Sequence, residues 1–499
     1  MNRAIKRVII AGGGTAGWMT AALLRKVLPA SIGIRLVESE QIGIVGVGEA
    51  TIPPIQTFNN SLGIDEKEFI RETQATIKLA IKFENWRTGN DSYYHTFAAP
   101  GTNLGFCSFQ HYWLKAQASG MSQSLWDFDL NYLCCEQGKF NKINTSNPLY
   151  ELQYAYHFDS ALYGRFLRKH AQANGVKRDE GIIKSVQVNP QNGAVESLLM
   201  ESGQRIAGDL FIDCTGTRAL LLQQTLGVEY LDWSYWLPAN SAITVPTQRH
   251  KYTLPYTRSI AHNAGWLWCI PLQHRNGNGL VYSDRFITDD EAQQLLLNNL
   301  DSPILGEPKL LKFKTGRVAK QWHKNVVAVG LASGFLEPLE STSIYLIQSA
   351  IVRLLKLFPT QGIHDSSVSL FNAECAEEYE TIRDFIILHY YLNERNDSNF
   401  WLKMQQLELP QRMQQKIALF KDSAAIFNDK LDIFRDASWL QVMLGQGIHP
   451  QRWHPSADCI DKNELLKLME KIRKEKFRPL EKMKTHDEFL NQYTSSRAV

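Results

Sequence analysis

Three glycines near the start of the chain have the spacing Gly-x-Gly-x-x-Gly and directly follow the apolar run 8–11. A buried strand, a glycine turn and a helix in that order form a dinucleotide-binding unit. Gly12 permits the tight turn, Gly14 lets the backbone approach a pyrophosphate, and Gly17 lets the helix pack against the strand. Glu38 ends a second apolar run, roughly twenty residues after the last glycine, where a ribose hydroxyl requires a carboxylate. The spacing predicts a dinucleotide site but does not separate FAD from NAD.

A second candidate site is the segment 335–343, which precedes an apolar stretch typical of a helix. The N–H groups at a helix N-terminus, reinforced by the helix dipole, bind anions. A helix cap is the more common explanation of the same residues. In that case Ser341 or Thr342 is the N-cap, and Glu340 complements the dipole.

Two further groups of residues have simple structural explanations. Residues 76–83 alternate between apolar and other side chains, which is the period of a strand. Lys78 and Lys82 then share a polar strand face, where a lysine is commonly solvated. Trp266 and Trp268 fall on one side of another expected strand and, taken alone, indicate core packing.

The composition is that of a globular protein: 44% of the 499 residues are apolar, 21% are charged and the net charge is +3. The near-neutral charge gives no reason to expect nucleic-acid binding. The basic stretch 471–476 is expected to be the solvated face of an amphipathic helix. Seven cysteines without Cys-x-x-Cys spacing argue against a disulfide framework and a zinc site, so no metal is expected.

The N-terminal residues enter an apolar strand at once, without the regions of a signal peptide. No apolar run reaches the roughly twenty residues that a membrane helix needs. We therefore expect a soluble, cytoplasmic protein with no membrane partner.

Periodicity and turn residues place the main elements. The expected elements are a helix over 160–173, a hairpin around the turn 189–193, strands over 208–216 and 325–330, and a helix over 344–358. They indicate one sheet assembled from residues 1–50, 180–220 and 320–358. Such discontinuous assembly is, by analogy, typical of FAD enzymes with the glutathione-reductase-like topology.

We therefore expect an α/β fold with two parts. The first is a doubly wound FAD-binding domain over 1–364, with a substrate-lining insertion at 51–179 and a strand-rich one at 221–319. The second is a mostly helical, substrate-covering region over 365–499.

Beyond these patterns, the chain resembles the flavin-dependent tryptophan halogenases from residue 5 to about residue 420. The specific motifs are the strand with Lys78, Trp-x-Trp-x-Ile-Pro at 266–271 and Glu-Pro-Leu-Glu-Ser-Thr at 337–342. Further matches are the glycine box with Trp18, the loop 46–51, and short motifs at 95–97, 156–159, 383–385 and 395–397.

The resemblance implies that reduced FAD, O2 and chloride or bromide give hypohalous acid. The N–H groups of Thr342 and Ser343 would hold the halide. The oxidant would cross an internal passage to Lys78, which hydrogen-bonds it or forms a haloamine. Glu340 would orient the oxidant and help to remove the proton from the ring that is halogenated.

The resemblance also assigns binding residues. Trp266 and Trp268 would shield the flavin, and His95 and Phe97 would sandwich an indole ring. The implied FAD-binding residues are Gly12, Gly14, Thr15, Ala16, Gly17, Glu38, Glu49, Ala50 and Ile344.

Only one dinucleotide motif is visible in the sequence, and no second site for NAD(P)H is found. Reduced FAD must then arrive from elsewhere. We expect a separate NAD(P)H-dependent flavin reductase that supplies it by diffusion.

Two departures from the family pattern concern the halide and the substrate. Ser343 stands where the family usually has glycine, and a Cβ there can change the fit of the halide. The segment 427–440 is shorter than the one that holds free tryptophan in the family. We expect a more open pocket that takes indole or a similar electron-rich ring.

Two other functions fit parts of the sequence. A flavin-dependent aromatic hydroxylase shares the dinucleotide motif but does not need Lys78. An inactive FAD-binding protein would not need Lys78 or Glu340 either. The mass of the product separates halogenation from hydroxylation.

Overall fold

The computed structural model describes residues 4–41 and 48–495. Part of the predicted loop 46–51, namely Gly46 and Val47, therefore lies outside the described residues. The chain divides into two compact units, each made of three separate segments. The first unit contains residues 1–75, 158–241 and 311–380, and the second contains residues 76–157, 242–310 and 381–499.

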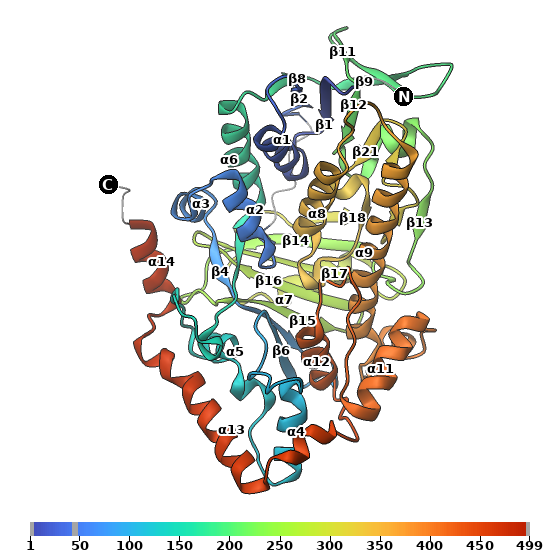
Figure 1. The fold of residues 1–499 in the computed structure, drawn as a ribbon. Coiled ribbons are helices and arrows are strands. Elements are labelled where there is room, and N and C mark those ends of the chain that lie inside the picture. The colour runs from blue at the N-terminus through green and yellow to red at the C-terminus, as the bar shows by residue number, and fades with distance from the viewer. Residues whose placement is uncertain (1–3, 42–47, 496–499) are drawn as a thin grey trace. The chain divides into compact units, whose positions relative to one another are not determined.

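The first unit is built on a six-stranded sheet that fans out in the upper part of Figure 1. Its order is β20 (Trp322–His323), β21 (Val326–Ala328), β12 (Leu210–Asp213), β1 (Arg7–Ala11), β2 (Gly33–Glu38) and β8 (Lys177–Glu180). The strands are parallel except for β20, which is antiparallel to β21. The predicted α/β fold with a discontinuous parallel sheet is thereby confirmed.

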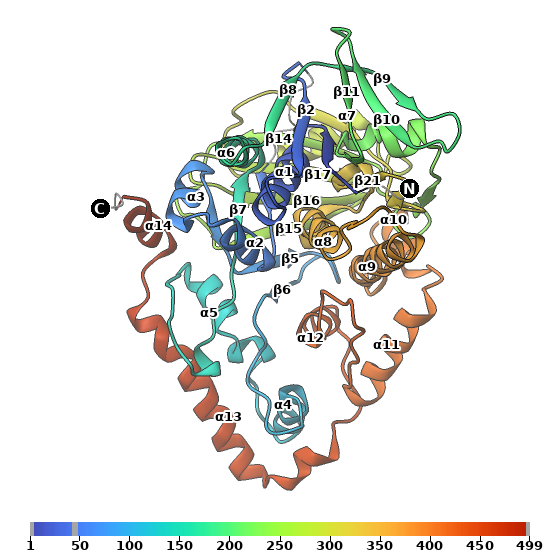
Figure 2. The ribbon, with the colours of Figure 1, turned by 45° about the horizontal axis from the view of Figure 1, so that its top comes forward.

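Three helices of this unit lie side by side over the sheet: α6, α1 and α8 (Figure 2). They span Ser160–Ala173, Thr15–Val27 and Ser343–Lys356. The predicted helix over 160–173 is confirmed at both ends, and the one over 344–358 is confirmed with slightly shifted bounds. The unit also contains α2 (Pro54–Leu62), α3 (Glu66–Glu72), β3 (Gly48–Ala50) and a small sheet of β13 (Tyr230–Asp232), β19 (Gly316–Val318) and β22 (Gly334–Phe335).

The remaining sheet of the first unit is the predicted hairpin with one more strand. It contains β9 (Ile183–Val188), β10 (Val195–Met200) and β11 (Arg205–Ala207), paired antiparallel. Buried side chains of this sheet pack with one face of β1 and β2, where Ile9, Ala11 and Val37 share a core with Leu198. Alternation along β1 turns Val8 and Ile10 to the opposite face.

The second unit contains a seven-stranded sheet. Its order is β18 (Lys309–Lys312), β14 (Ser241–Thr247), β17 (Asn276–Tyr282), β16 (Gly265–Pro271), β15 (Tyr256–His262), β5 (Ala80–Glu84) and β6 (Ser92–Thr96). Apolar residues of β14, β16 and β17 form a core with α7 (Asp289–Asn298). The strand predicted over 76–83 is interrupted at Leu79, because β4 (Thr76–Lys78) pairs with β7 (Ala155–Asp159) whereas β5 joins the large sheet.

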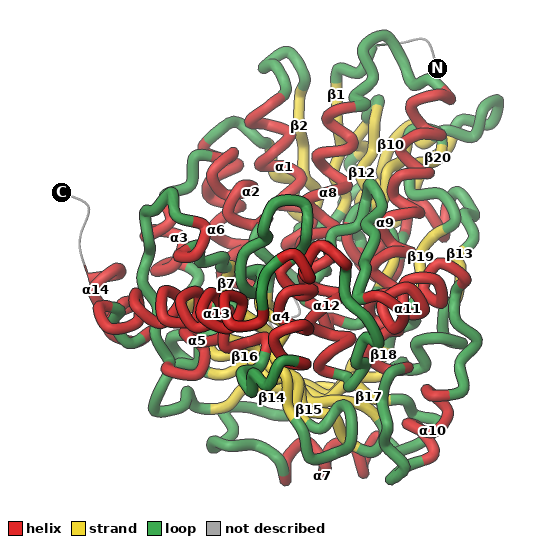
Figure 3. The backbone as a smooth tube through the Cα atoms, turned by 60° about the horizontal axis from the view of Figure 1, so that its bottom comes forward, coloured by secondary structure: helices red, strands yellow, loops and turns green. Residues whose placement is uncertain are grey.

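The C-terminal residues are mainly helical, as predicted. The helices are α9 (Asp365–Tyr391), α10 (Asn399–Gln405), α11 (Gln411–Ser423), α12 (Asp436–Gly445), α13 (Lys462–Phe477) and α14 (His486–Ser495). Figure 3 shows α13 against α4 (Phe109–Ala118) and α5 (Leu130–Gln137). The division of domains at residue 364 stays a prediction.

All seven cysteines are free thiols, and six of them are buried. Within residues 4–41 and 48–495, no group of His, Cys, Asp and Glu has the arrangement of a metal site. Among the same residues no helix is both long and apolar enough to cross a membrane.

Candidate active site

The turn between β1 and α1 requires glycine at two positions. Gly12 has φ +107°, and a Cβ there would lie 2.1 Å from the carbonyl oxygen of Cys214. A Cβ on Gly17 would lie 1.9 Å from the carbonyl oxygen of Gly12. Neither distance is compatible with a side chain, so the tight turn and the close packing of α1 both depend on these glycines.

The start of α1 has the properties of an anion site. Gly14 is the N-cap residue, no side chain caps the helix, and the first turn contains no acidic residue. A Cβ on Gly14 would meet no atom within 4 Å, so space is available beside the backbone. The first N–H groups of a helix need partners, and a phosphate satisfies them. Thr15 and Ala16 open this helix, and the Thr15 hydroxyl is 3.4 Å from the carbonyl oxygen of Ser160.

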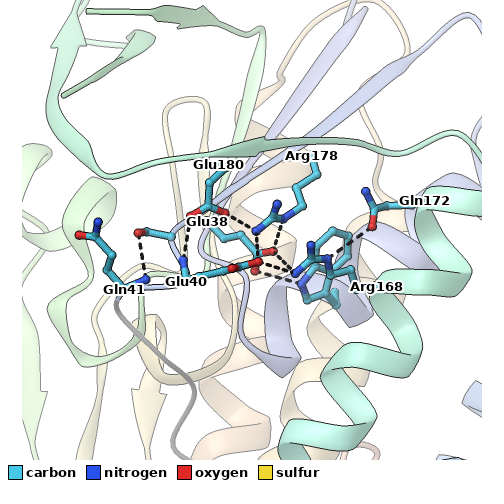
Figure 4. A network of polar contacts seen from close by, with 9 residues as sticks. Glu38, Glu40, Gln41, Arg168, Gln172, Arg178 and Glu180 are labelled. Atoms are coloured by element: carbon cyan, nitrogen blue, oxygen red, sulfur yellow. Dashed lines mark hydrogen bonds and ion pairs between the residues drawn. The ribbon is translucent and has the colours of Figure 1, made fainter. Parts of the chain in front are cut away.

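Glu38 lies beside this turn in a network of charged groups (Figure 4). The indole Nε1 of Trp18 donates to its Oε2 at 3.2 Å. Its Oε1 accepts from the Arg178 guanidinium at 2.5 Å and is 3.4 Å from Nη1 of Arg168. The two arginines were not predicted as site residues. No sequence signal pointed to Arg178, because its place beside Glu38 depends on the pairing of β8 with β2.

Two more predicted cofactor residues, Glu49 and Ala50, lie on β3. Burial raises the pKa of the Glu49 carboxyl to about 7. Ile344 is buried in the first turn of α8. The structure therefore places every predicted FAD-binding residue in the first unit.

The start of α8 differs from the cap that the sequence favoured. Thr342 is the N-cap residue, but its side chain makes no capping hydrogen bond. Ser341 has φ +60°, in the left-handed region that a serine rarely adopts, and Glu340 is buried just before it. Ser343 begins the helix without a positive φ, so its Cβ causes no backbone strain. A helix start without a side-chain cap or an acidic first turn suits an anion.

Lys78 is fully buried at the end of β4, in the second unit. The expectation of a solvated polar strand face is therefore wrong for this residue, because the chain leaves the β4 sheet at Leu79 and the alternation does not continue. Its Nζ lies 5.1 Å from the centre of the Phe97 ring, which is within reach of a cation–π interaction.

The predicted substrate residues lie in the same unit as Lys78. His95 is buried, with its ring 5.5 Å from Phe385 and 6.0 Å from Phe434. Phe385 and Phe434 stack at 4.1 Å. Phe385 belongs to the Arg-Asp-Phe motif at 383–385, to which the sequence assigned no role. Phe434 belongs to the shortened segment 427–440.

The segment 427–440 is held in place by a buried ion pair. Nζ of Lys416 on α11 is 2.6 Å from Oδ2 of Asp432, and both side chains are almost fully buried. The same Nζ lies 4.6 Å from the ring of Trp439 and 5.1 Å from that of Phe427. Asp429 is paired with the guanidinium of Arg412. Two of the three carboxylates of this segment, those of Asp429 and Asp432, are thus engaged by cations of α11.

Trp266 and Trp268 lie on β16 with their ring centres 6.0 Å apart. Trp266 is 1% exposed and contacts Trp86, so it is a core residue. Trp268 packs over Gly279, where a Cβ would lie 2.2 Å from its ring. The packing explanation holds for both residues, and flavin shielding by them stays a prediction.

A sequence model described as tryptophan halogenase matches residues 7–462. The chain belongs to the tryptophan halogenase family. It is therefore an enzyme, a flavin-dependent halogenase, as the sequence motifs predicted.

Individual relatives agree with this assignment. The halogenase is 36% identical to the tryptophan 7-halogenase RebH of Lentzea aerocolonigenes over 450 residues, which are 85% of this chain and 84% of that protein. It superimposes on a flavin-dependent halogenase from Xanthomonas campestris with a TM-score of 0.96 at 46% identity, covering 100% of both chains. It also superimposes on BrvH, a flavin-dependent halogenase from Brevundimonas sp. BAL3, with a TM-score of 0.94 at 38% identity, covering 98% of this chain and 99% of that one.

The halogenase's first unit fits the FAD that this family uses. The open space at Gly14 and the N-terminus of α1 suit the pyrophosphate, and Glu38 beside the turn suits a ribose hydroxyl. Lys78, His95, Phe97, Trp266 and Trp268 all lie in the second unit. The joint action of Lys78 and Glu340 therefore stays a prediction.

Proposed function

We propose that this halogenase uses FADH2, O2 and chloride or bromide to make hypohalous acid, and transfers the halogen to indole or a related electron-rich ring. The observation that supports the proposal most strongly is the buried amine of Lys78 beside Phe97, in the unit that also holds His95. Burying an amine in an apolar region is costly, and such residues are commonly functional.

The first unit would hold the cofactor and the halide. When bound, reduced FAD would supply two electrons to O2 and the halide would supply two more, so that one oxygen atom leaves as water and the other becomes that of hypohalous acid. Gly14, Thr15 and Ala16 at the start of α1 would bind the pyrophosphate, and Glu38, oriented by Arg178, would accept from the ribose. The N–H groups of Thr342 and Ser343 would hold the halide, because the start of α8 carries neither a side-chain cap nor an acidic first turn.

The second unit would hold the oxidant and the substrate. The Lys78 amine would donate a hydrogen bond to the oxygen of hypohalous acid, or form a haloamine with it, and so favour attack of the ring on the halogen. The ring would gain the halogen, the hydroxide left from hypohalous acid would take a proton from the protonated Lys78 amine and leave as water, and Glu340 would accept the ring proton. His95 and Phe97 would contact the two faces of the ring.

The segment 427–440 supports a preference for indole over free tryptophan. An amino-acid substrate requires a carboxylate for its ammonium group. The carboxylates of Asp429 and Asp432 are paired with Arg412 and Lys416, so they have cations of the chain as partners. The apolar rings of Phe385 and Phe434 remain as contacts for an aromatic substrate.

The chain carries one dinucleotide motif, so we propose that a separate NAD(P)H-dependent flavin reductase supplies FADH2 by diffusion. The test is an assay with a reductase, NADH, FAD and either chloride or bromide, with indole and tryptophan in competition. We expect halogenated indole, identified by its isotope pattern, in at least tenfold excess over halogenated tryptophan. Preferred turnover of tryptophan would contradict the substrate proposal, and a gain of oxygen alone would contradict the reaction.

A further inference from the structure

Strand β4, which carries Lys78, lies at one edge of its small sheet. The sheet order is β3–β7–β4, and the pairs with β7 are Thr76 with His157, Ile77 with Tyr156 and Lys78 with Ala155. Thr76, Ile77 and Lys78 are all fully buried. Their outward-facing backbone groups are therefore cut off from water and need partners within the protein.

His486 supplies one of these partners from 409 positions further along the chain. The backbone N–H of Ile77 donates to Nε2 of His486 at 3.0 Å. Because Nε2 accepts, the ring proton lies on Nδ1, which donates to the carbonyl oxygen of Thr253 at 2.9 Å. Asp487 holds Thr253 in turn, accepting from its N–H at 3.0 Å and from its hydroxyl at 2.6 Å. The start of α14 thus fastens the outer side of β4.

His157 on β7 forms a hydrogen bond with Thr76 of the same strand. The Thr76 hydroxyl donates its only proton to the carbonyl oxygen of Pro271 at 2.7 Å. It must therefore accept from Nδ1 of His157, which is 3.0 Å away. Nε2 of His157 then accepts from the hydroxyl of Thr257 at 2.9 Å. The hydrogen bonds assign the same neutral tautomer to His157 and to His486.

The surroundings keep both imidazoles neutral. Burial lowers the pKa of His157 well below its usual value, and the positive charge of Lys78 and the neighbouring His486 lower it further. Burial also lowers the pKa of His486 to about 4, although the Thr253 carbonyl and the carboxylate of Asp487 act in the opposite direction. Two uncharged rings are thus fixed around the strand that carries the buried amine.

We infer that His157 and His486 are positioning residues for Lys78: their ring nitrogens bond both sides of β4 and fix where the amine is presented. This inference rests on the proposed role of Lys78 in halogen transfer. It gives a role to the Tyr-His-Phe-Asp motif at 156–159 and to the start of the C-terminal helix α14. A misplacement of about 1 Å is enough to slow a positioned reaction by roughly a hundredfold.

The first test compares two substitutions of His486 in the full-length halogenase. His486→Gln keeps an acceptor for the Ile77 N–H, whereas His486→Leu fills similar space without one. We expect His486→Leu to lower kcat for indole roughly ten- to hundredfold, with KM and the Kd for FAD changed less than about threefold. His486→Gln should restore kcat to within about threefold of the wild type. The matched control is His449→Gln, an exposed histidine of the same unit, which should leave kcat unchanged.

Two results would overturn the inference: an unchanged kcat in His486→Leu, or an equal loss of kcat in the Gln and Leu variants. The tautomers provide a test that does not depend on any variant's folding. In the wild-type protein with 15N-labelled histidine, we expect both rings to be protonated at Nδ1 and bare at Nε2 at pH 7. A bare Nδ1 on either ring would contradict the assignment.

Substitution of Lys78 distinguishes this inference from the proposed function. If Lys78→Met remains fully active, the proposed role of the amine is wrong. If Lys78→Met is inactive while His486→Leu keeps its kcat, the proposed function stands and the positioning role is wrong.

Discussion

The turn that begins α1 and the strand that carries Lys78 are held by partners at very different distances in the sequence. Gly17 of α1 lies against the Gly12 carbonyl five positions earlier, and Glu38 follows on the next strand of the same sheet, although Gly12 also lies against the carbonyl of the distant Cys214. The partners of β4 lie much further away: the Pro271 carbonyl is 195 positions from Thr76, and His486 is 409 positions from Ile77.

This difference has a consequence for substitutions. The turn depends on backbone space, so a methyl group added at Gly12 or Gly17 disturbs its fold, whereas one added at Gly14 would disturb only its ligand. The strand depends on side-chain hydrogen bonds, so a change there can alter the reaction while the cofactor still binds. Substitutions in the two regions should therefore separate loss of cofactor from loss of halogen transfer.

The largest effect is expected from Lys78→Met, which keeps the length of the side chain and removes the amine. Halogenation of indole should fall by roughly a thousandfold, because a positioned donor is worth up to that much. The Kd for FAD should stay the same, since Lys78 and the FAD-binding residues belong to different units. Lys82→Met, at the less buried lysine of the same stretch, is the matched control and should keep most of the activity. Weak FAD binding in Lys78→Met would contradict the separation of cofactor binding from halogen transfer.

Gly17→Ala should have the next largest effect. Its Cβ would lie 1.9 Å from the Gly12 carbonyl, so the helix and strand must separate, at a cost of about 3 kcal/mol or more in unfolding free energy. Gly14→Ala is the variant to compare with it, because it adds the same methyl group at a place where the Cβ meets nothing within 4 Å. That variant should keep the stability of the protein without FAD but lose FAD affinity. Thermal melts with and without FAD measure both effects, and unchanged FAD affinity in Gly14→Ala would place the pyrophosphate elsewhere.

Much of the first region was predictable because its determinants are local. Glycine spacing, apolar runs and the position of Glu38 are visible in the sequence, and helix α6 was predicted at both ends. The surroundings of Lys78 were not predictable in the same way. The alternation over 76–83 suggested one strand with solvated lysines, whereas the break at Leu79 and the contacts with Thr257, Pro271 and His486 depend on tertiary packing. The pairing of Glu38 with Arg178 required knowledge that β8 joins the sheet beside β2.

Arg178→Gln should have an intermediate effect on the first region. Removing a charged partner of Glu38 leaves that carboxylate less well oriented, and FAD affinity should fall roughly tenfold. Arg71→Gln is the control, since its pair with Glu72 in the same unit is exposed and should contribute little. Titration of FAD by fluorescence measures the Kd of both variants. A normal Kd for Arg178→Gln would show that Glu38 does not need this arginine to bind FAD.

His486, which bonds the strand that carries Lys78, makes the unfolding free energy of the protein depend on pH. Its pKa is about 4 in the folded protein, against 6.5 as the ordinary value, so the folded state binds the proton less readily than the unfolded state. The stabilisation from the neutral ring is present above pH 6.5 and is lost as the pH falls toward 4. Between pH 7 and pH 4.5 we expect the wild type to lose about 2 kcal/mol more unfolding free energy than His486→Gln. Chemical denaturation at pH 7 and pH 4.5 measures the difference, and parallel pH profiles would contradict it.

Ser343→Gly should have the smallest effect. The serine adopts a helical backbone without a positive φ, so the change should alter stability by less than about 1 kcal/mol. Loss of the Cβ should shift the ratio of chlorinated to brominated indole by a few-fold, because the N–H of this residue is proposed to hold the halide. Competition between the two halides, followed by mass spectrometry, measures the ratio. An unchanged ratio would place the halide away from the start of α8.

The separation of oxidant formation from halogen transfer can be measured directly in Lys78→Met. The variant is supplied with a flavin reductase, NADH, FAD and bromide, together with indole and a diffusible scavenger of hypohalous acid in large excess, so that oxidant released into solution is captured before it reacts with indole. We predict that the scavenger is brominated at a rate close to the flux of the wild-type enzyme, while bromoindole formation is lost. Loss of both products would show that Lys78 is needed to form the oxidant, and normal bromoindole formation would show that the amine does not transfer the halogen.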